Sequence, residues 1–410
     1  MTPADLSTAE LLQYASIPVV AALIGWITNW LAVKLTFKPL EFVGIPPFLG
    51  WQGIIPSKAR KMADLCVDAT IAKLGTVQEI FEQIDPELLS QHVIDSLMPR
   101  VEEYVDDVMT REHRTLWENL PMRARKIVYD RVRKSAPSLV DKLVTDIGLQ
   151  IDTLLDLKKL VADCLEADRE LLNRLFQECG EAEFRFIINS GFVFGFIFGL
   201  FQMVAWYFYP SSWVLPVCGF IVGWATNWIA LNIIFRPVRP TKVGPFVIQG
   251  LFLKRQPEVA NVFCDIVTQE ILTVGNILNF MLNGPQSGHM RAIIRKHVKP
   301  LVDETAGITK PLTQIAFGPS GFAKLREQVG EHAIMLSHET FDDPLFNKSR
   351  ATAVAAIMRE RMMLLSPEEF QALLRPCFQE DEVKLIMIGG VLGMLAGVAQ
   401  LIWVFGESML

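Results

Sequence analysis

Several chemical signatures that mark enzymes and nucleic-acid binders are missing from this chain of 410 residues. Its six cysteines include no C-x-x-C pair and no zinc-ligand spacing, so the sequence predicts neither a disulfide framework nor a metal site, and a reducing compartment is expected. The six histidines are scattered without an H-E-x-x-H motif, and there is no Walker lysine motif or dinucleotide fingerprint. A net charge of −6 gives no case for nucleic-acid binding. We therefore expect no catalytic residue, no cofactor and no nucleic-acid partner, and we predict that the protein is not an enzyme.

Apolar residues are abundant instead, at 51% of the chain with a mean hydropathy of +0.30. Four apolar windows reach the length of about 20 residues that crosses a bilayer. They cover about 15–37, 186–208, 214–236 and 384–406. The only charged residues in them, Lys34, Arg236 and Lys384, lie near window ends. Soluble helices rarely stay apolar on every face over six turns, so these windows indicate transmembrane helices rather than buried helices of a soluble protein.

Lysine and arginine gather just after the first and third windows, and such residues mark the cytoplasmic side of a membrane protein. The first group is Lys34, Lys38, Lys58, Arg60 and Lys61, and the second is Arg236, Arg239, Lys242, Lys254 and Arg255. Residues 1–14 and the loop 209–213 contain neither lysine nor arginine. We therefore expect both large segments, about 38–185 and 237–383, in the cytoplasm and both termini outside.

The chain also contains an internal repeat, which must be recognised before a fold is assigned. The stretch GWITNWLAVKLTFKPL (25–40) returns 198 residues later as GWATNWIALNIIFRPV (223–238). The same offset relates Gly191, Gly195, Gly199 and Gln202 to Gly389, Gly393, Gly397 and Gln400. The sequence thus predicts two tandem units, 1–209 and 210–410, each with a span, a cytoplasmic helical segment and a second span. Two crossings return the chain to its starting side, so the copies form a parallel repeat.

Small residues four positions apart share one helix face and predict close packing between the spans, because lipid provides no hydrophobic drive between helices. This predicted helix-packing seam comprises Gly25, Gly191, Gly195, Gly199, Gly223, Gly389, Gly393 and Gly397.

Polar Thr-Asn pairs lie on the same faces, at Thr28 and Asn29 and at Thr226 and Asn227. A side-chain amide in hydrocarbon must find hydrogen-bond partners. The expected partners are the threonines, Asn189 and backbone carbonyl groups. Two interpretations stay open: interhelical hydrogen bonds of about 1 kcal/mol each, or a polar binding site for a lipid head group or a solute.

The basic clusters also have two interpretations. They signal topology, or they additionally attract anionic lipid by about 1 kcal/mol per charge. The residues in question are Lys58, Arg60, Lys61, Arg236, Arg239, Lys254 and Arg255.

The cytoplasmic segments show helical periodicity, notably over 86–109 and 137–165. Residues 366–378 begin with Ser366, Pro367 and Glu369 in the order of a capping box. These helices could form a bundle or lie on the membrane surface. Strand signals are sparse, so the predicted fold is an all-α membrane protein with four transmembrane helices in two tandem parallel repeats, each with a cytoplasmic helical domain.

Three motifs resemble a bacterial membrane family, the domain of unknown function 445, which includes YheB-like proteins. They are GWITNWLA (25–32), F-x-P (37–39) and GIIP (53–56). The resemblance implies a bacterial inner-membrane protein that is helical apart from its loops and has no established reaction. The second copy departs from the last motif, with Leu251, Phe252 and Leu253 in place of Ile-Ile-Pro.

The leading functional hypothesis is a non-enzymatic integral inner-membrane protein that contacts lipid or scaffolds partners at the membrane surface. The expected partners are membrane lipid and, through the glycine faces, a second copy or another membrane protein. The alternative is a passive channel or carrier along the Thr-Asn-lined seam. No Asp, Glu or His lies inside a span, which argues against ion-coupled transport.

Overall fold

A computed structural model describes residues 8–45, 49–67, 75–209, 211–306, 343–379 and 382–405, together with 323, 327–331, 333, 334 and 341. The chain divides into two compact units. Unit 1 contains residues 1–70, 162–263 and 362–410, and unit 2 contains residues 71–161 and 264–361. Three of the four boundaries fall within helices α10 (Leu157–Ala167), α15 (Gln256–Ile266) and α19 (Pro344–Met363).

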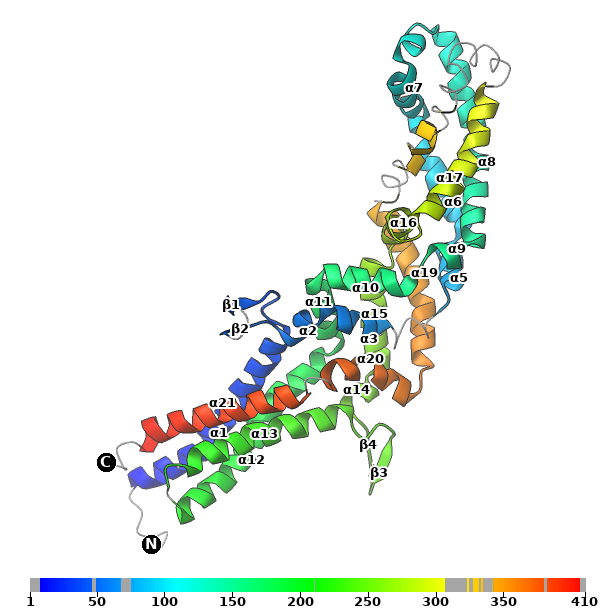
Figure 1. Ribbon diagram of the computed structural model, residues 1–410. Helices are drawn as coiled ribbons and strands as arrows, with labels where there is room; N and C mark the ends of the chain where they lie inside the picture. The colour runs from blue at the N-terminus through cyan, green and yellow to red at the C-terminus, as the bar shows by residue number, and fades with distance from the viewer. Residues whose placement is uncertain are drawn as a thin grey trace. The chain divides into compact units, whose positions relative to one another are not determined.

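Four long apolar helices pack side by side in unit 1 (Figure 1). They are α1 (Thr8–Phe37), α12 (Glu181–Phe208), α13 (Val214–Phe235) and α21 (Glu382–Phe405). Each is long and apolar enough to cross a membrane. The four predicted windows are therefore confirmed as candidate spans, although residue 406 lies outside the described residues. Apolar side chains on all faces explain why these helices need lipid rather than water around them.

A small antiparallel sheet of two strands follows α1, and a second one follows α13. Strands β1 (Val43–Ile45) and β2 (Leu49–Trp51) follow α1, and β3 (Thr241–Val243) and β4 (Phe246–Ile248) follow α13. The expectation of an all-α fold is wrong at these two places. At the second place the reason is local: Gly244 adopts a left-handed φ of 62° between β3 and β4, which a glycine tolerates and which turns the chain back.

Short helices complete unit 1 beside the bundle. They are α2 (Ile54–Ser57), α3 (Ala59–Cys66), α11 (Arg169–Cys179), α14 (Leu251–Lys254) and α20 (Pro367–Gln379), with parts of α10 and α15. Helix α20 starts at the predicted capping box, where the Glu369 amide donates to the Ser366 hydroxyl at 3.3 Å and the Ser366 amide donates to the Glu369 carboxylate at 3.0 Å. Phe252 of α14 stacks on Phe370 of α20 with ring centres 4.7 Å apart, so apolar contacts hold these helices together.

The described residues of unit 2 form helices and the turns that join them. Its helices are α5 (Val77–Ile84), α6 (Pro86–Leu97), η3 (Met98–Arg100), α7 (Val101–Glu118), α8 (Met122–Leu149), α9 (Ile151–Leu154), the π-helix η4 (Val267–Ile271), α16 (Val274–Asn283) and α17 (Ser287–Ala306), with parts of α10, α15 and α19. The predicted helices over 86–109 and 137–165 are confirmed as α6 to α7 and α8 to α10. Helix α8 packs against α17, so the middle parts of both large segments form one unit, whereas the sequence assigned each to its own repeat.

Candidate functional site

Glycines bring the backbones of two helix pairs into contact, α1 with α12 and α13 with α21. A Cβ atom on Gly191 would lie 2.6 Å from the Asn29 amide nitrogen and 2.8 Å from the Gly25 carbonyl carbon. A Cβ atom on Gly223 would lie 2.8 Å from the Gly389 carbonyl carbon. The remaining predicted glycines also meet neighbouring backbone within 3.0 Å of such an added atom, at Gly25, Gly195, Gly199, Gly389, Gly393 and Gly397. A side chain at any of these positions would therefore push the helices apart.

Two asparagines link the same helix pairs by hydrogen bonds. The Asn29 amide nitrogen donates to the Ile187 carbonyl oxygen at 2.7 Å, and the Asn227 amide nitrogen donates to the Leu385 carbonyl oxygen at 3.0 Å. In both pairs the donor and acceptor are 158 residues apart in the chain. Both side chains are buried, whereas the other expected partner, Asn189, is exposed. Backbone carbonyl groups, which were among the expected partners, are thus the acceptors.

The threonines of the same pairs bond within their own helices. The Thr28 hydroxyl donates to the Gly25 carbonyl oxygen at 3.2 Å, and the Thr226 hydroxyl donates to the Gly223 carbonyl oxygen at 3.2 Å. Both threonines are buried. The geometry at the Thr-Asn pairs is that of helix packing, and a role of these four residues in ligand binding stays a prediction.

Basic residues of the four long helices lie at one end of the bundle. Lys34 and Arg236 are near the last turns of α1 and α13, and Arg185 and Lys384 are near the first turns of α12 and α21. Gly25 meets Gly191 while Ala21 meets Gly195, and Gly223 meets Gly389 while Gly219 meets Gly393. The helices of each pair are therefore antiparallel, and these ends meet. We call this end, defined by those four cations, the basic end.

Two β-hairpins, β1–β2 and β3–β4, follow α1 and α13 at the basic end. The sequence analysis did not predict them. Their apolar side chains are exposed: Phe42, Val43 and Ile45 in the first hairpin, and Phe246, Val247 and Ile248 in the second. Ile45 and Phe246 are each 71% exposed. A V-G-P-F-V-I run around Gly244 was a usable signal, because β-branched and aromatic residues on both sides of a glycine are typical of a hairpin.

Equivalent hydrogen bonds fix the base of each hairpin to the end of its long helix. The Gly53 amide donates to the Pro39 carbonyl oxygen at 2.9 Å, and the Gly250 amide donates to the Pro237 carbonyl oxygen at 3.0 Å. An added Cβ atom on either glycine would meet backbone within 3.0 Å. The hairpins are therefore held close to the basic end.

Three of the predicted lipid-contact cations have acidic partners inside the protein. Arg60 pairs with Glu166 at 2.7 Å, and Arg239 pairs with Glu368 at 2.5 Å. The hydrogen bond from Arg239 holds the pKa of the Glu368 carboxyl group below its ordinary value. These pairs are exposed, so they contribute little stability.

The third pair is different because its carboxylate is buried. Both oxygens of Glu183, whose side chain is 6% exposed, accept hydrogen bonds from one guanidinium nitrogen of Arg255, at 2.9 and 2.7 Å. The guanidinium group of Arg255 therefore neutralises the buried charge of Glu183. Lys58 and Lys61 also interact with other groups of the protein, and Arg236 and Lys254 are exposed.

Among the described residues, no three His, Cys, Asp or Glu side chains are arranged to hold a metal ion. The buried thiol of Cys264 has a pKa raised to about 12 by desolvation, which makes it a poor nucleophile. Cys179 is also buried, and the side chains of Cys66 and Cys377 lie outside the described residues.

Comparison with known proteins gives short matches to bacterial membrane proteins. The chain is 31% identical over 98 residues to UPF0754 membrane proteins of two strains of Staphylococcus epidermidis, covering 23% of this chain and 26% of each relative. It is 33% identical over 85 residues to a UPF0754 membrane protein of a Synechococcus strain, covering 20% of this chain and 21% of the relative. The chain therefore spans about a quarter of the length of the curated relatives it matches.

Together with the four long apolar helices, these relatives support a multi-pass membrane protein. No protein-family model matches the chain, and no solved structure matches it. The relatives point to an uncharacterised bacterial membrane family and do not single out the domain of unknown function 445.

Proposed function

We propose that the chain is a non-enzymatic integral protein of the bacterial inner membrane that contacts lipid at the cytoplasmic interface through its two β-hairpins. The four long helices form two tandem parallel hairpins, both large segments lie in the cytoplasm, and both termini lie outside. The G-x-x-T-N-x-x-A motif further supports membership of the domain of unknown function 445.

The orientation is supported by the basic end of the bundle. Four cations from four separate helices gather there, and lysine and arginine are enriched on the cytoplasmic side of membrane proteins. The side chain of Lys34 extends over the Trp30 ring, with its nitrogen 4.8 Å from the ring centre. A tryptophan and a lysine in contact are typical of the membrane–water interface, where the ring faces lipid and the ammonium group faces water.

The exposed apolar side chains of the two hairpins carry the proposal of lipid contact. A two-stranded hairpin is marginally stable in water, and these two expose Ile45 and Phe246 where a water-facing hairpin would place polar residues. Both are held at the basic end by the bonds from Gly53 and Gly250, next to the predicted bilayer surface. Exposed Lys38 and Lys242 beside them suit anionic lipid.

A photoreactive lipid tests this proposal without altering the protein. We would place the full chain in nanodiscs that contain a phosphatidylglycerol with a diazirine near the head-group end of one acyl chain, irradiate, and map the labelled peptides by mass spectrometry. Peptides covering 41–52 and 240–250 should be labelled. The matched control is the peptide around Met122, an exposed methionine of unit 2, which should remain unlabelled.

A second arm uses the double variant Phe246→Asp with Val247→Asp, which places charge on the second hairpin. Labelling of that hairpin should fall several-fold while labelling of the first hairpin and of the long helices persists. Labelling confined to the four long helices in the unaltered chain would contradict interfacial contact by the hairpins.

The passive channel has less support from the geometry. It requires polar groups that face a water-filled path, whereas the hydroxyl groups of Thr28 and Thr226 are buried and donate to carbonyl groups of their own helices. We therefore do not advance it as a second function.

A further inference from the structure

Unit 2 contains a cavity of about 160 Å³ whose lining is apolar. Helices α5, α6, α8, α16 and α17 supply most of it, including Ile84, Leu143, Val144, Ile277 and Met281. Protein interiors are packed closely enough that voids larger than a water molecule are few. An apolar cavity of this size stays dry and accepts a molecule of about six carbon atoms, such as benzene.

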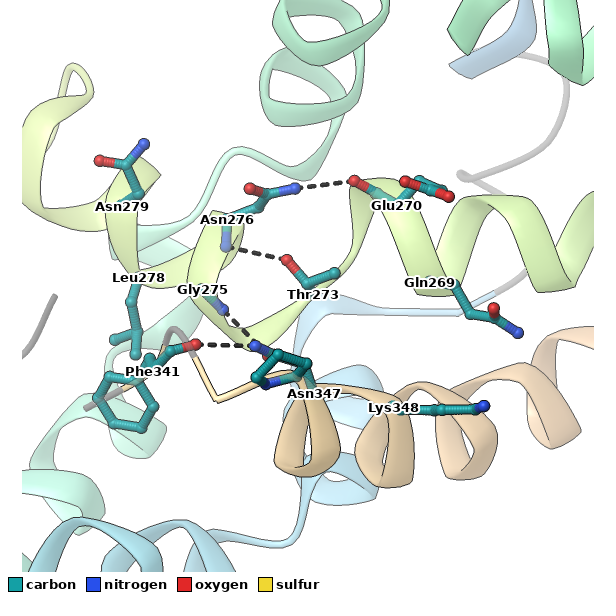
Figure 2. Close-up of a pocket in the computed structure, with 11 residues that line it drawn as sticks. Gln269, Glu270, Thr273, Gly275, Asn276, Leu278, Asn279, Phe341, Asn347 and Lys348 are labelled. Atoms are coloured by element: carbon teal, nitrogen blue, oxygen red, sulfur yellow. Dashed lines mark hydrogen bonds between the residues drawn. The ribbon is translucent and has the colours of Figure 1, made fainter. Parts of the chain in front are cut away.

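A larger polar pocket of about 660 Å³ adjoins this apolar cavity, because Leu278 and Phe341 line both. Figure 2 shows that the polar residues come from η4, from α16 and the residue before it, and from the start of α19. They are Gln269, Glu270, Thr273, Asn276, Asn279, Asn347 and Lys348. One wall is thus rich in amide and hydroxyl groups while the adjoining interior offers only hydrocarbon.

Hydrogen bonds among these residues hold the wall of the polar pocket in place. The Asn347 amide nitrogen donates to the Phe341 carbonyl oxygen at 2.8 Å, and its amide oxygen accepts from the Gly275 amide at 3.4 Å. The Asn276 backbone amide donates to the Thr273 hydroxyl oxygen at 3.1 Å (Figure 2). The Thr273 hydroxyl hydrogen therefore points elsewhere, and a ligand in the pocket is able to accept it.

From this juxtaposition we propose that unit 2 binds one amphipathic lipid, with the end of a single acyl chain in the apolar cavity and the head group in the polar pocket. The polar pocket carries one lysine, Lys348, and one carboxylate, Glu270, among amide and hydroxyl groups. This composition suits a zwitterionic phosphate head group such as that of a lysophosphatidylethanolamine. The site is separate from the hairpins of unit 1, so it extends the proposed function and stands or falls independently of it.

Chain length is the variable that distinguishes this site from ordinary partitioning. Each buried methylene group strengthens binding by about fourfold until the cavity is full. We would titrate lysophosphatidylethanolamines with acyl chains of graded length, below their micelle-forming concentrations, against the full chain in nanodiscs. Empty nanodiscs give the background from bilayer uptake.

Two variants isolate the two parts of the site. Val144→Phe fills the apolar cavity from the α8 side and should weaken binding of a medium-chain ligand at least tenfold and flatten its chain-length dependence. Lys348→Gln should weaken binding of the same ligand several-fold while leaving the gain per methylene group unchanged. The matched control is Lys299→Gln, since Lys299 is an exposed lysine of unit 2 outside both cavities.

A thermal-unfolding curve shows whether Val144→Phe still folds. If it does not fold, the unaltered protein is tested instead with a ligand that carries a diazirine at the end of its acyl chain. Irradiation is then expected to label Leu143, Ile277 or Met281. The proposal is overturned if Val144→Phe folds and binds every chain length as the unaltered protein does. It is equally overturned if that diazirine labels only the long helices of unit 1.

Discussion

Substitution of Gly191 tests how the long helices pack, because a methyl group at this position would clash with α1. In Gly191→Ala, the new carbon would lie 2.8 Å from the Gly25 carbonyl carbon and 2.6 Å from the Asn29 amide nitrogen. Non-bonded carbon atoms pack best about 3.5–4.0 Å apart, so α1 and α12 must separate locally by about 1 Å.

The cost of this separation has three parts. Forced overpacking costs about 1–3 kcal/mol, and weakening the hydrogen bond from Asn29 to Ile187 adds about 1 kcal/mol. The higher helix propensity of alanine stabilises the folded state by about 1 kcal/mol and offsets part of this cost. We therefore expect Gly191→Ala to lower the free energy of unfolding by about 1–3 kcal/mol. Gly389→Ala should cost a similar amount, because its added carbon would meet Asn227 in the same way.

Unfolding by sodium dodecyl sulfate from nanodiscs or mild micelles, followed by tryptophan fluorescence, measures this difference. Gly288→Ala is the matched control, since a Cβ atom there would meet nothing within 4 Å. It should leave the unfolding midpoint within about 0.5 kcal/mol of the unaltered protein. If Gly191→Ala proves as stable as Gly288→Ala, the close backbone contact between α1 and α12 is refuted.

Three further predictions follow from other contacts. Asn29→Ala should lower stability by about 1 kcal/mol in the same assay, and unchanged stability would show that its hydrogen bond is not formed. Arg255→Ala should cost about 3 kcal/mol because it leaves the Glu183 carboxylate buried without its cation, and Arg255→Ala with Glu183→Gln should recover most of that loss. Burial and a hydrogen bond to Asp106 raise the pKa of Tyr129 to about 12, so the protonated phenol is favoured by folding. This stabilisation is complete below the ordinary value of 10.0 and is lost as pH rises to about 12, and Tyr129→Phe should remove that part of the pH dependence of unfolding.

The long helices could be read from sequence because their signal is local. Twenty consecutive apolar residues already specify a span, and glycines at four-residue spacing already specify a face. The side on which Gly25 and Gly191 meet follows from the same spacing. The hydrogen-bond acceptor of Asn29 could not be predicted from sequence, because any carbonyl group within reach would satisfy the amide. Only the register of α1 against α12 selects Ile187.

The features of unit 2 could not be read in this way. Its apolar cavity is bounded by helices from two segments of chain, 71–161 and 264–361, whose pairing no local pattern specifies. Apolar positions on α8 and α16 predict amphipathic helices, but the sequence does not tell whether their side chains fill the space between them. The hairpins were missed for another reason, since strands of three residues give too short an alternation to be recognised. For the second hairpin the usable signal was the composition around Gly244, not the alternation.

The basic residues show why composition alone overstates contact with lipid. As sequence, Arg60, Arg239 and Arg255 were equivalent cations beside a span. In the fold each faces a carboxylate, and these acidic partners lie about 70 to 130 residues away in the chain, at Glu166, Glu183 and Glu368. A cation that already has a partner must exchange that partner for a lipid phosphate, which reduces the net attraction.

The apolar side chains of the hairpins have no such competing partner to give up, since insertion into lipid replaces only water. Exposed phenylalanine, isoleucine and valine side chains gain about 25 cal/mol for each Å² removed from water. Lipid contact at the basic end should for this reason depend more on Ile45 and Phe246 than on the arginines. It should also persist at high salt, whereas contact held by cations alone would weaken as salt screens the charges.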